Sequence, residues 1–138
     1  MPLQRVVVDA SAALKWVLEE EGSPDALELL GQDVLHAPDF LLLEVANVLR
    51  TKVRRGALSR SDADAAFRTL AAVPMALTPL AELIRPARSL AFALDLTVYD
   101  AVYAALAQQL DCPLATADRT LAAAMTAAGL AGSAQLVR

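Results

Sequence analysis

The amino-acid sequence predicts an α/β fold, in the form of a three-layer α/β/α sandwich with a short central parallel sheet. Short apolar runs alternate with longer segments of helical periodicity, which is the pattern that β-α-β connections produce. Hydrophobic residues make up 57% of the chain and aromatic residues only 4%, so alanine, leucine and valine must supply most of the core. The 138 residues suit one domain, and we expect a single unit over residues 1–138.

In the first half of the chain, two apolar runs alternate with segments whose apolar residues follow helical spacing. Pro24 suits the first turn of a short helix. Asp39 is expected to cap a long helix, and Gly56 is expected to end it. We therefore expect strands at 5–8 and 34–37, and helices at about 10–20, 23–31 and 40–56.

In the second half, the boundaries of the elements are marked by helix caps and by proline. Ser59, Thr97 and Asp118 are good N-cap residues, and Pro79 suits the first turn of a helix. We therefore expect helices at about 59–72, 79–94, 98–110 and from 118 onwards, with strands at 73–77, 112–115 and 134–138.

The composition argues against several classes of protein. The single Cys112 cannot form an internal disulfide, and the single His36 lacks a second histidine for a zinc site. We expect His36 to be structural or to lie on the surface, and the chain to act in a reducing cytoplasm. No apolar run approaches the roughly 20 residues that a membrane-spanning helix needs, so no membrane contact is expected.

Charge is distributed unevenly along the chain, whose net charge is −4. Residues 1–49 carry two basic and nine acidic residues, whereas residues 50–88 carry eight basic and three acidic residues. The cationic middle segment either forms a solvated helical surface or contacts the phosphates of a nucleic acid. Arg54, Arg55 and Arg60 are the candidates for phosphate contact.

Four acidic residues are expected at one edge of the predicted sheet. Asp9 and Asp118 each follow a predicted strand, and ligands bind outside the carboxyl ends of parallel strands. Asp100 lies in the first turn of a helix that runs back antiparallel to the strands, so it can face the same edge. Glu44 lies inside an apolar helical run, where a carboxylate is costly to bury without a partner. Asn47 shares a helix face with Glu44.

Each acid also has a purely structural interpretation. Asp9 and Asp118 could cap helices, Asp100 could belong to a capping box with Thr97, and Glu44 could reach solvent. Independent caps have no reason to meet, however, whereas the expected topology can place all four acids at one edge. Their mutual repulsion favours a divalent cation, and an all-oxygen ligand set suits Mg²⁺ or Mn²⁺. Such an ion can activate water at a phosphodiester.

Four motifs of this chain resemble those of the PIN domain, especially in the VapC toxins of bacterial type II toxin–antitoxin systems. In order they are VVVDASAALKW, LLLEVANVL, YDAVYAALAQQL and LATADRTL, spanning residue 6 to about 122. The resemblance implies a Mg²⁺-dependent endoribonuclease. The implied catalytic residues are Asp9, Glu44, Asp100 and Asp118, of which Asp9, Asp100 and Asp118 hold the metal.

The resemblance also implies supporting residues and partners. Ser11, Asn47 and Thr116 match polar positions near the acids, and RNA is the implied substrate. Related toxins form homodimers, and a VapB-type antitoxin holds each of them inactive. We expect water to attack phosphorus in line, leaving a 5′-phosphate and a 3′-hydroxyl. A catalytically silent PIN-like module that only binds partners is the alternative.

Two other classes of α/β protein fit the sequence less well. A haloacid-dehalogenase-type phosphatase needs a second aspartate two residues after the first, and Ser11 stands there. A response-regulator receiver domain needs a phosphate-accepting aspartate at the end of the third strand. The segment 74–80 contains none.

Overall fold

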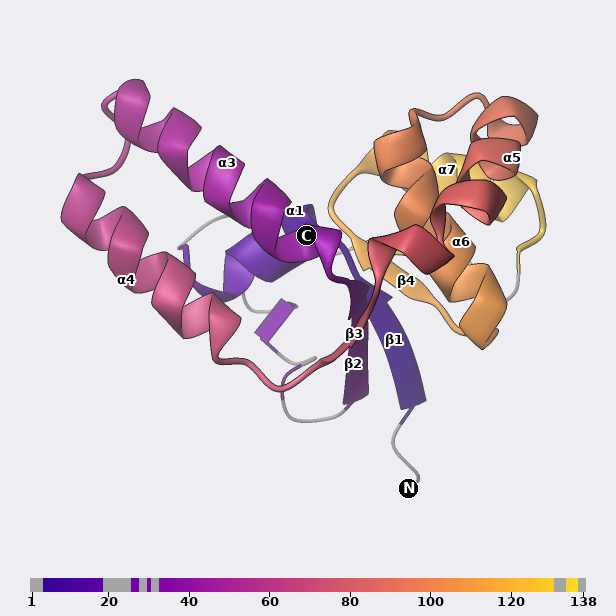
Figure 1. Cartoon of the computed structure of the whole chain (residues 1–138), viewed down its shortest axis with the longest axis horizontal. Coiled ribbons are helices and arrows are strands. Elements are labelled where there is room, and N and C mark those ends of the chain that lie inside the picture. Colours follow the sequence, from indigo (N-terminus) through magenta and orange to yellow (C-terminus); the bar gives the residue numbers. More distant parts are fainter. Residues whose placement is uncertain (1–3, 19–25, 28–29, 31–32, 131–133, 137–138) are drawn as a thin grey trace.

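The computed structural model, which describes residues 4–18, 26–27, 30, 33–130 and 134–136, contains a parallel sheet between helices (Figure 1). Within these ranges the sheet has five strands in the order β3-β2-β1-β4-β5, and each neighbouring pair is parallel. The strands are β1 (Gln4–Val8), β2 (Asp33–Pro38), β3 (Ala76–Thr78), β4 (Leu114–Thr116) and β5 (Ala134–Leu136). The predicted α/β class and parallel sheet are confirmed.

Helices cover both faces of this sheet. Figure 1 shows α1, α3 and α4 on one side of the strands and α5, α6 and α7 on the other. Right-handed crossovers require this division when the chain first adds strands on one side of β1 and then on the other. The helical elements are α1 (Ala10–Ala13), η1 (Leu14–Trp16), α3 (Phe40–Arg54), α4 (Arg60–Ala71), η2 (Leu80–Glu82), α5 (Ile84–Leu94), α6 (Val98–Leu110) and α7 (Arg119–Ala127).

The core is built around β1 and α6. Val6, Val7 and Val8 are buried at the centre of the sheet, and every residue of α6 from Ala101 to Ala107 is buried. Alanine lets this helix pack closely against both α5 and the sheet, which accounts for the low aromatic content. Within the described ranges no single helix is long and apolar enough to span a bilayer. Together α5 and α6 reach that length and apolar character, but they are bent by 109° at the break between them.

Two predicted helices differ from those observed, and a third cannot be compared. The predicted helix at 10–20 tightens into a 3₁₀ turn at Leu14. The predicted helix at 79–94 is divided into η2 and α5, which begins at Ile84. A helix continuing from 79 would place Pro86 in its interior, whereas a start at Ile84 leaves it in a first turn, where no amide proton is needed. The predicted helix at 23–31 lies mostly outside the described residues.

The prediction that the side chain of Asp39 caps α3 is wrong. Its Oδ1 instead accepts a hydrogen bond from the backbone amide of Leu80, at 2.9 Å, and α3 has no side-chain cap. This contact fixes the start of η2 beside the end of β2. At the other end of α3, Gly56 has a φ of +76° and ends the helix as predicted.

Candidate active site

The candidate site lies where the sheet changes direction. From β1 the chain builds β2 and β3 on one side, and it then returns to place β4 and β5 on the other side. Val8, the last residue of β1, pairs with Ala115 in β4. Asp9 and Thr116 therefore follow this pair at the carboxyl edge of two adjacent strands. In open parallel sheets this switch point is where ligands bind.

Asp9 is the most buried of the four acids, with an exposed fraction of 6%. Its Oδ1 accepts hydrogen bonds from Ser11 Oγ at 2.6 Å and from the amide of Ala12 at 3.0 Å, and its Oδ2 accepts one from the Thr116 hydroxyl. Asp9 thus caps α1 and also lies in the cluster. Burial raises its pKa, the three donors lower it, and the charge of Asp100 adds to the increase.

Two hydroxyl groups determine how the Asp9 carboxylate is held. Ser11 Oγ accepts a hydrogen bond from the amide of Ala117, and Thr116 Oγ1 accepts one from the amide of Asp118, both at 2.9 Å. Because these amides occupy hydroxyl lone pairs, each hydroxyl proton is directed at Asp9. Three of the roughly four lone-pair positions of that carboxylate are then filled, which leaves about one position on Oδ2 for a cation.

Glu44 on α3 is joined to Tyr103 on α6. The Tyr103 hydroxyl donates to Glu44 Oε1 at 2.5 Å, and the side chain of Tyr103 is almost fully buried. Burial raises the pKa of Glu44, the Tyr103 hydrogen bond lowers it, and the charges of Asp9 and Asp100 raise it further. The same burial, together with Glu44, raises the pKa of Tyr103, so this phenol stays protonated and acts as a donor.

Tyr103 is a residue of this site that was not expected from the sequence. The signal was nevertheless present, because a tyrosine inside an alanine-rich buried segment needs a partner for its hydroxyl. Glu44 was a carboxylate in need of a partner on another apolar helix. Each residue therefore supplies what the other lacks.

We expect Tyr103→Phe to reduce stability through Glu44. The substitution removes the hydrogen bond but keeps the ring, so the Glu44 carboxylate is left half-buried without its donor. Unfolding in urea at pH 8 should show a loss of about 1–3 kcal/mol. Tyr99→Phe is the matched control, because the Tyr99 side chain is exposed and no described hydrogen bond involves its hydroxyl. Equal stability of the two variants would contradict this assignment.

Asp100 and Asp118 complete the cluster. The amide of Asp100 donates to the Thr97 hydroxyl at 3.1 Å, so Thr97 caps α6 as predicted. Burial raises the pKa of Asp100, and the charge of Asp118 adds to this. Asp118 caps α7 through Oδ1, which accepts the amides of Thr120 and Leu121 at 2.9 and 3.1 Å. No described hydrogen bond involves the other Asp118 oxygen.

The four acids lie within electrostatic reach of one another at this edge of the sheet. Asp100 interacts electrostatically with each of the other three acids. Its charge raises the pKa values of Asp9 and Glu44, and the charge of Asp118 raises the pKa of Asp100. The ion pair described between Arg60 and Asp64 involves none of these acids. The supporting residues differ, because Ser11 and Thr116 contact Asp9 directly, whereas Asn47 is exposed and has no described hydrogen bond to the cluster.

The carboxylates of this site suit a hydrated divalent cation. In the part of the chain that the structure describes, no three Asp, Glu, His or Cys side chains are arranged to hold an ion directly. Mg²⁺ keeps several of its waters and commonly binds through only one or two carboxylates. An all-oxygen cluster that repels itself and offers a remaining lone pair on Asp9 fits such a hydrated ion, and it does not fit a closed zinc site.

The three candidate arginines lie away from the acids. Arg54 and Arg60 line a groove of about 580 Å³ between α3 and α4, together with Arg50 and Arg68, whereas Arg55 does not. Ten residues of α3 separate Glu44 from Arg54, which corresponds to about 15 Å along the helix. The structure thus separates this groove, which is lined by four arginines, Asp64 and apolar side chains, from the acidic cluster.

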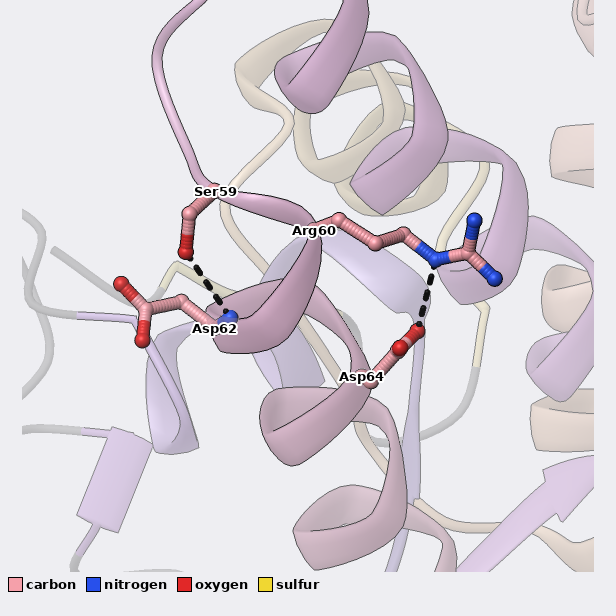
Figure 2. A network of polar contacts seen from close by, with 4 residues as sticks. All are labelled: Ser59, Arg60, Asp62 and Asp64. Carbon is pink, nitrogen blue, oxygen red and sulfur yellow. Dashed lines mark hydrogen bonds and ion pairs between the residues drawn. The ribbon is translucent and has the colours of Figure 1, made fainter.

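Arg60 has a carboxylate neighbour of its own. Figure 2 shows Arg60 Nε beside Asp64 Oδ1, at 3.3 Å, one turn along α4, and Ser59 capping that helix through the amide of Asp62 at 3.0 Å. Both members of the ion pair are exposed, and such i,i+4 pairs contribute little to stability. The two terminal nitrogens of Arg60 have no described hydrogen bond, so they can still bind an anion.

Comparison with known proteins places this site in a family. Residues 6–125 match the PIN domain family, and the chain belongs to that family. It is 39% identical over 121 residues to ribonuclease VapC3 of Pyrobaculum aerophilum, which covers 86% of this chain and 92% of that protein. It is 36% identical over 138 residues to ribonuclease VapC1 of Mycobacterium tuberculosis, covering 99% and 100% of the two chains. Its relatives are thus VapC ribonucleases, which supports nuclease activity.

Two solved structures have the same fold. PAE2754 of Pyrobaculum aerophilum superposes with a TM-score of 0.69 at 23% identity, over 95% of this chain and 83% of that one. VapC20 of Mycobacterium tuberculosis, described as a toxin that cleaves the sarcin–ricin loop, gives a TM-score of 0.66 at 18% identity. That match covers 92% of this chain and 97% of VapC20. At these identities the likeness confirms the fold alone.

Proposed function

We propose that this chain is a metal-dependent endoribonuclease, the toxin of a VapBC-type pair, and that it hydrolyses RNA phosphodiester bonds in the cytoplasm. The observation that carries the proposal is the meeting of Asp9, Glu44 and Asp100 at the switch point of the sheet, each with a raised pKa. Perturbed carboxylates grouped at such an edge are typical of catalytic sites. The names of the relatives support RNA as the substrate.

The residues have separate proposed roles. Asp9, Asp100 and Asp118 hold Mg²⁺, or Mn²⁺, directly or through water. When bound, such an ion makes water a nucleophile at neutral pH and offsets charge on the phosphoryl oxygens. Ser11 and Thr116 are positioning residues, because their hydroxyls fix the Asp9 carboxylate.

Glu44 is proposed to orient the attacking water or accept its proton. A carboxylate with a raised pKa is a better base near neutral pH than an ordinary glutamate. Tyr103 holds Oε1 of Glu44, and the second oxygen has no described hydrogen bond. In-line attack at phosphorus would leave a 5′-phosphate and a 3′-hydroxyl.

Removal of metal tests the proposed chemistry. The purified protein should cut a labelled RNA of mixed sequence with Mg²⁺ present, and EDTA should abolish cleavage. Adding Mg²⁺ or Mn²⁺ in excess of the chelator should restore it, whereas Zn²⁺ should be much less effective because the site lacks nitrogen and sulfur ligands. Undiminished cleavage in EDTA would exclude the proposed metal mechanism.

The arginine groove is proposed to contact the RNA backbone. Replacing Arg54 and Arg60 by glutamine should remove two phosphate contacts, which flattens the slope of log Kd against log salt by about 1.4 for single-stranded RNA. The matched control replaces Arg85 and Arg88 on α5, which changes net charge equally on the other side of the sheet. If both double variants give the same slope, the groove does not bind RNA.

Two protein partners are also proposed. A VapB-type antitoxin would cover the acidic cluster, and an antitoxin arginine could pair with the uncompensated carboxylates. A homodimer is proposed for the free toxin. Co-expression with the product of a neighbouring small gene should yield a complex that does not cut RNA, and sedimentation of the free chain should give the mass of two copies.

A further inference from the structure

Two aromatic rings stack beside the acidic cluster. Phe40 is the first residue of α3, Tyr99 is the second residue of α6, and their ring centroids lie 5.7 Å apart with an interplanar angle of 18°. Tyr99 is 66% exposed although one face of its ring is covered by Phe40. Leu43 and Val98, on the first turns of the same helices, are also exposed. The pair is therefore an apolar surface that no described residue covers.

The position of this pair relative to the acids follows from helix geometry. Phe40 lies one turn before Glu44 on α3, and Tyr99 lies one turn before Tyr103 on α6. The two helices thus contact each other at two levels, through the stacked rings and through the Tyr103–Glu44 hydrogen bond. One turn corresponds to about 5.4 Å. The stacked rings therefore lie about one helical turn from the Glu44 carboxylate.

A flat apolar ring next to acids suits a nucleobase better than it suits a phosphate. The four carboxylates repel the RNA backbone, and Arg54 lies about 15 Å along α3 from Glu44. An uncharged contact can therefore add affinity close to the acids, beyond what a bound metal ion contributes. Unpaired bases stack on exposed aromatic side chains, whereas bases inside a duplex already stack on each other. Phe40 holds the Tyr99 ring in place, which lowers the entropy lost on binding.

We propose that Phe40 and Tyr99 form a platform on which an unpaired base stacks, next to the phosphate that the acids handle. This inference rests on the proposed ribonuclease function and adds a base-binding surface beside its acidic cluster. Tyr99 is the contact residue, and Phe40 is a positioning residue behind it.

Four substitutions of Tyr99 test the platform. Phenylalanine and tryptophan keep an aromatic face, whereas leucine and alanine remove it, with leucine keeping apolar bulk. With a short unstructured oligoribonucleotide as substrate, Tyr99→Ala and Tyr99→Leu should raise KM roughly tenfold. The kcat values should stay within about twofold, and Tyr99→Phe and Tyr99→Trp should resemble the wild type. Phe92→Ala, which removes an exposed aromatic ring held by Arg88, should leave KM unchanged.

The salt dependence separates stacking from charge. The tenfold increase in KM for Tyr99→Ala should be the same at low and at high salt, because no counterions are released when a base stacks. Circular dichroism and thermal unfolding of each variant check that the fold is kept. A duplex of the same sequence should be a poor substrate for the wild type and for every variant.

Each other outcome overturns the inference in a recognisable way. If Tyr99→Leu keeps the wild-type KM, no base stacks on the ring. If Tyr99→Phe raises KM as much as Tyr99→Ala does, the hydroxyl makes the contact. If Tyr99→Ala turns a dimer into a monomer in sedimentation without changing KM, a second copy covers the rings. A wild-type protein that neither binds nor cuts RNA overturns the proposed function as well, so the two failures are distinguishable.

Discussion

Asp100→Asn is expected to lower the rate of RNA cleavage roughly a thousandfold while the protein stays folded. Asp100 is the hub of the cluster, because its charge acts on Asp9 and Glu44. Asparagine keeps the shape of the side chain and removes the charge. Initial rates with a fluorescent RNA substrate and excess Mg²⁺ measure the effect.

Asp95→Asn is the matched control for this substitution. Asp95 ends α5 with a φ of 54°, a left-handed conformation that asparagine adopts readily, and its side chain is exposed. The charge change is the same, but the position lies outside the cluster. Wild-type cleavage by Asp95→Asn together with loss in Asp100→Asn would also exclude a contaminating nuclease, because all preparations are purified alike.

The effects of the acids should not add. If Asp9 and Asp100 act on one reaction step, the double Asn variant should be about as inactive as either single variant. Asp9→Asn is a weaker test by itself, because its new NH₂ group would face a donor on either side, the Thr116 hydroxyl or the Ala12 amide. Cleavage by the double variant at the wild-type rate would show that the acidic cluster is not the active site.

The positions of Asp9 and Asp118 at this edge could be predicted because local rules place both of them. The valines of β1 make a buried strand recognisable, and the residue after a parallel strand lies at its carboxyl edge. A caps-only interpretation and an active-site interpretation competed for Asp9 and Asp118. Both side chains do cap helices, so the two interpretations are compatible.

Contacts between distant segments could not be predicted in the same way. The Asp39 side chain accepts the amide of Leu80, 41 residues away, rather than an amide of its own helix. Tyr103 is 59 residues from Glu44, and helical periodicity gives no information about which helices cross. The distance of the arginines from the acids likewise depends on how far α3 extends beyond the sheet (Figure 1).

The second large effect concerns stability without metal. Burial raises the pKa values of Asp9, Glu44 and Asp100 above the ordinary 3.8 for aspartate and 4.5 for glutamate. Each folded carboxyl group therefore binds its proton more tightly than the unfolded one, and unfolding releases protons. By linkage, the stability that these groups contribute is present below their ordinary pKa values and is lost as the pH rises through the folded values. In EDTA, the cluster should thus destabilise the fold at neutral pH.

Comparison of the wild type with Asp100→Asn isolates this contribution. The pH dependence of stability that His36 contributes has the opposite sign, because burial lowers the pKa of this residue. His36 is present in both proteins, so its contribution cancels in the comparison. In EDTA the variant should melt roughly 3 °C higher than the wild type at pH 7.5, and this advantage should shrink toward pH 4. A constant difference across this range would mean that Asp100 has an ordinary pKa.

A divalent cation should reverse which of the two proteins has the higher melting temperature. Mg²⁺ that binds only the folded state stabilises it by about 2.7 kcal/mol when the free ion is at a hundred times its Kd. The wild type should gain this free energy of stabilisation at pH 7.5, because the ion offsets the repulsion among the acids. Asp100→Asn should be stabilised much less. Thermal melts with Mg²⁺ and with EDTA measure both effects, and Asp95→Asn should follow the wild type. If Mg²⁺ raised the melting temperature of all three proteins equally, it would be binding outside the acidic cluster, and a catalytic role for Asp100 would then have to operate without holding metal.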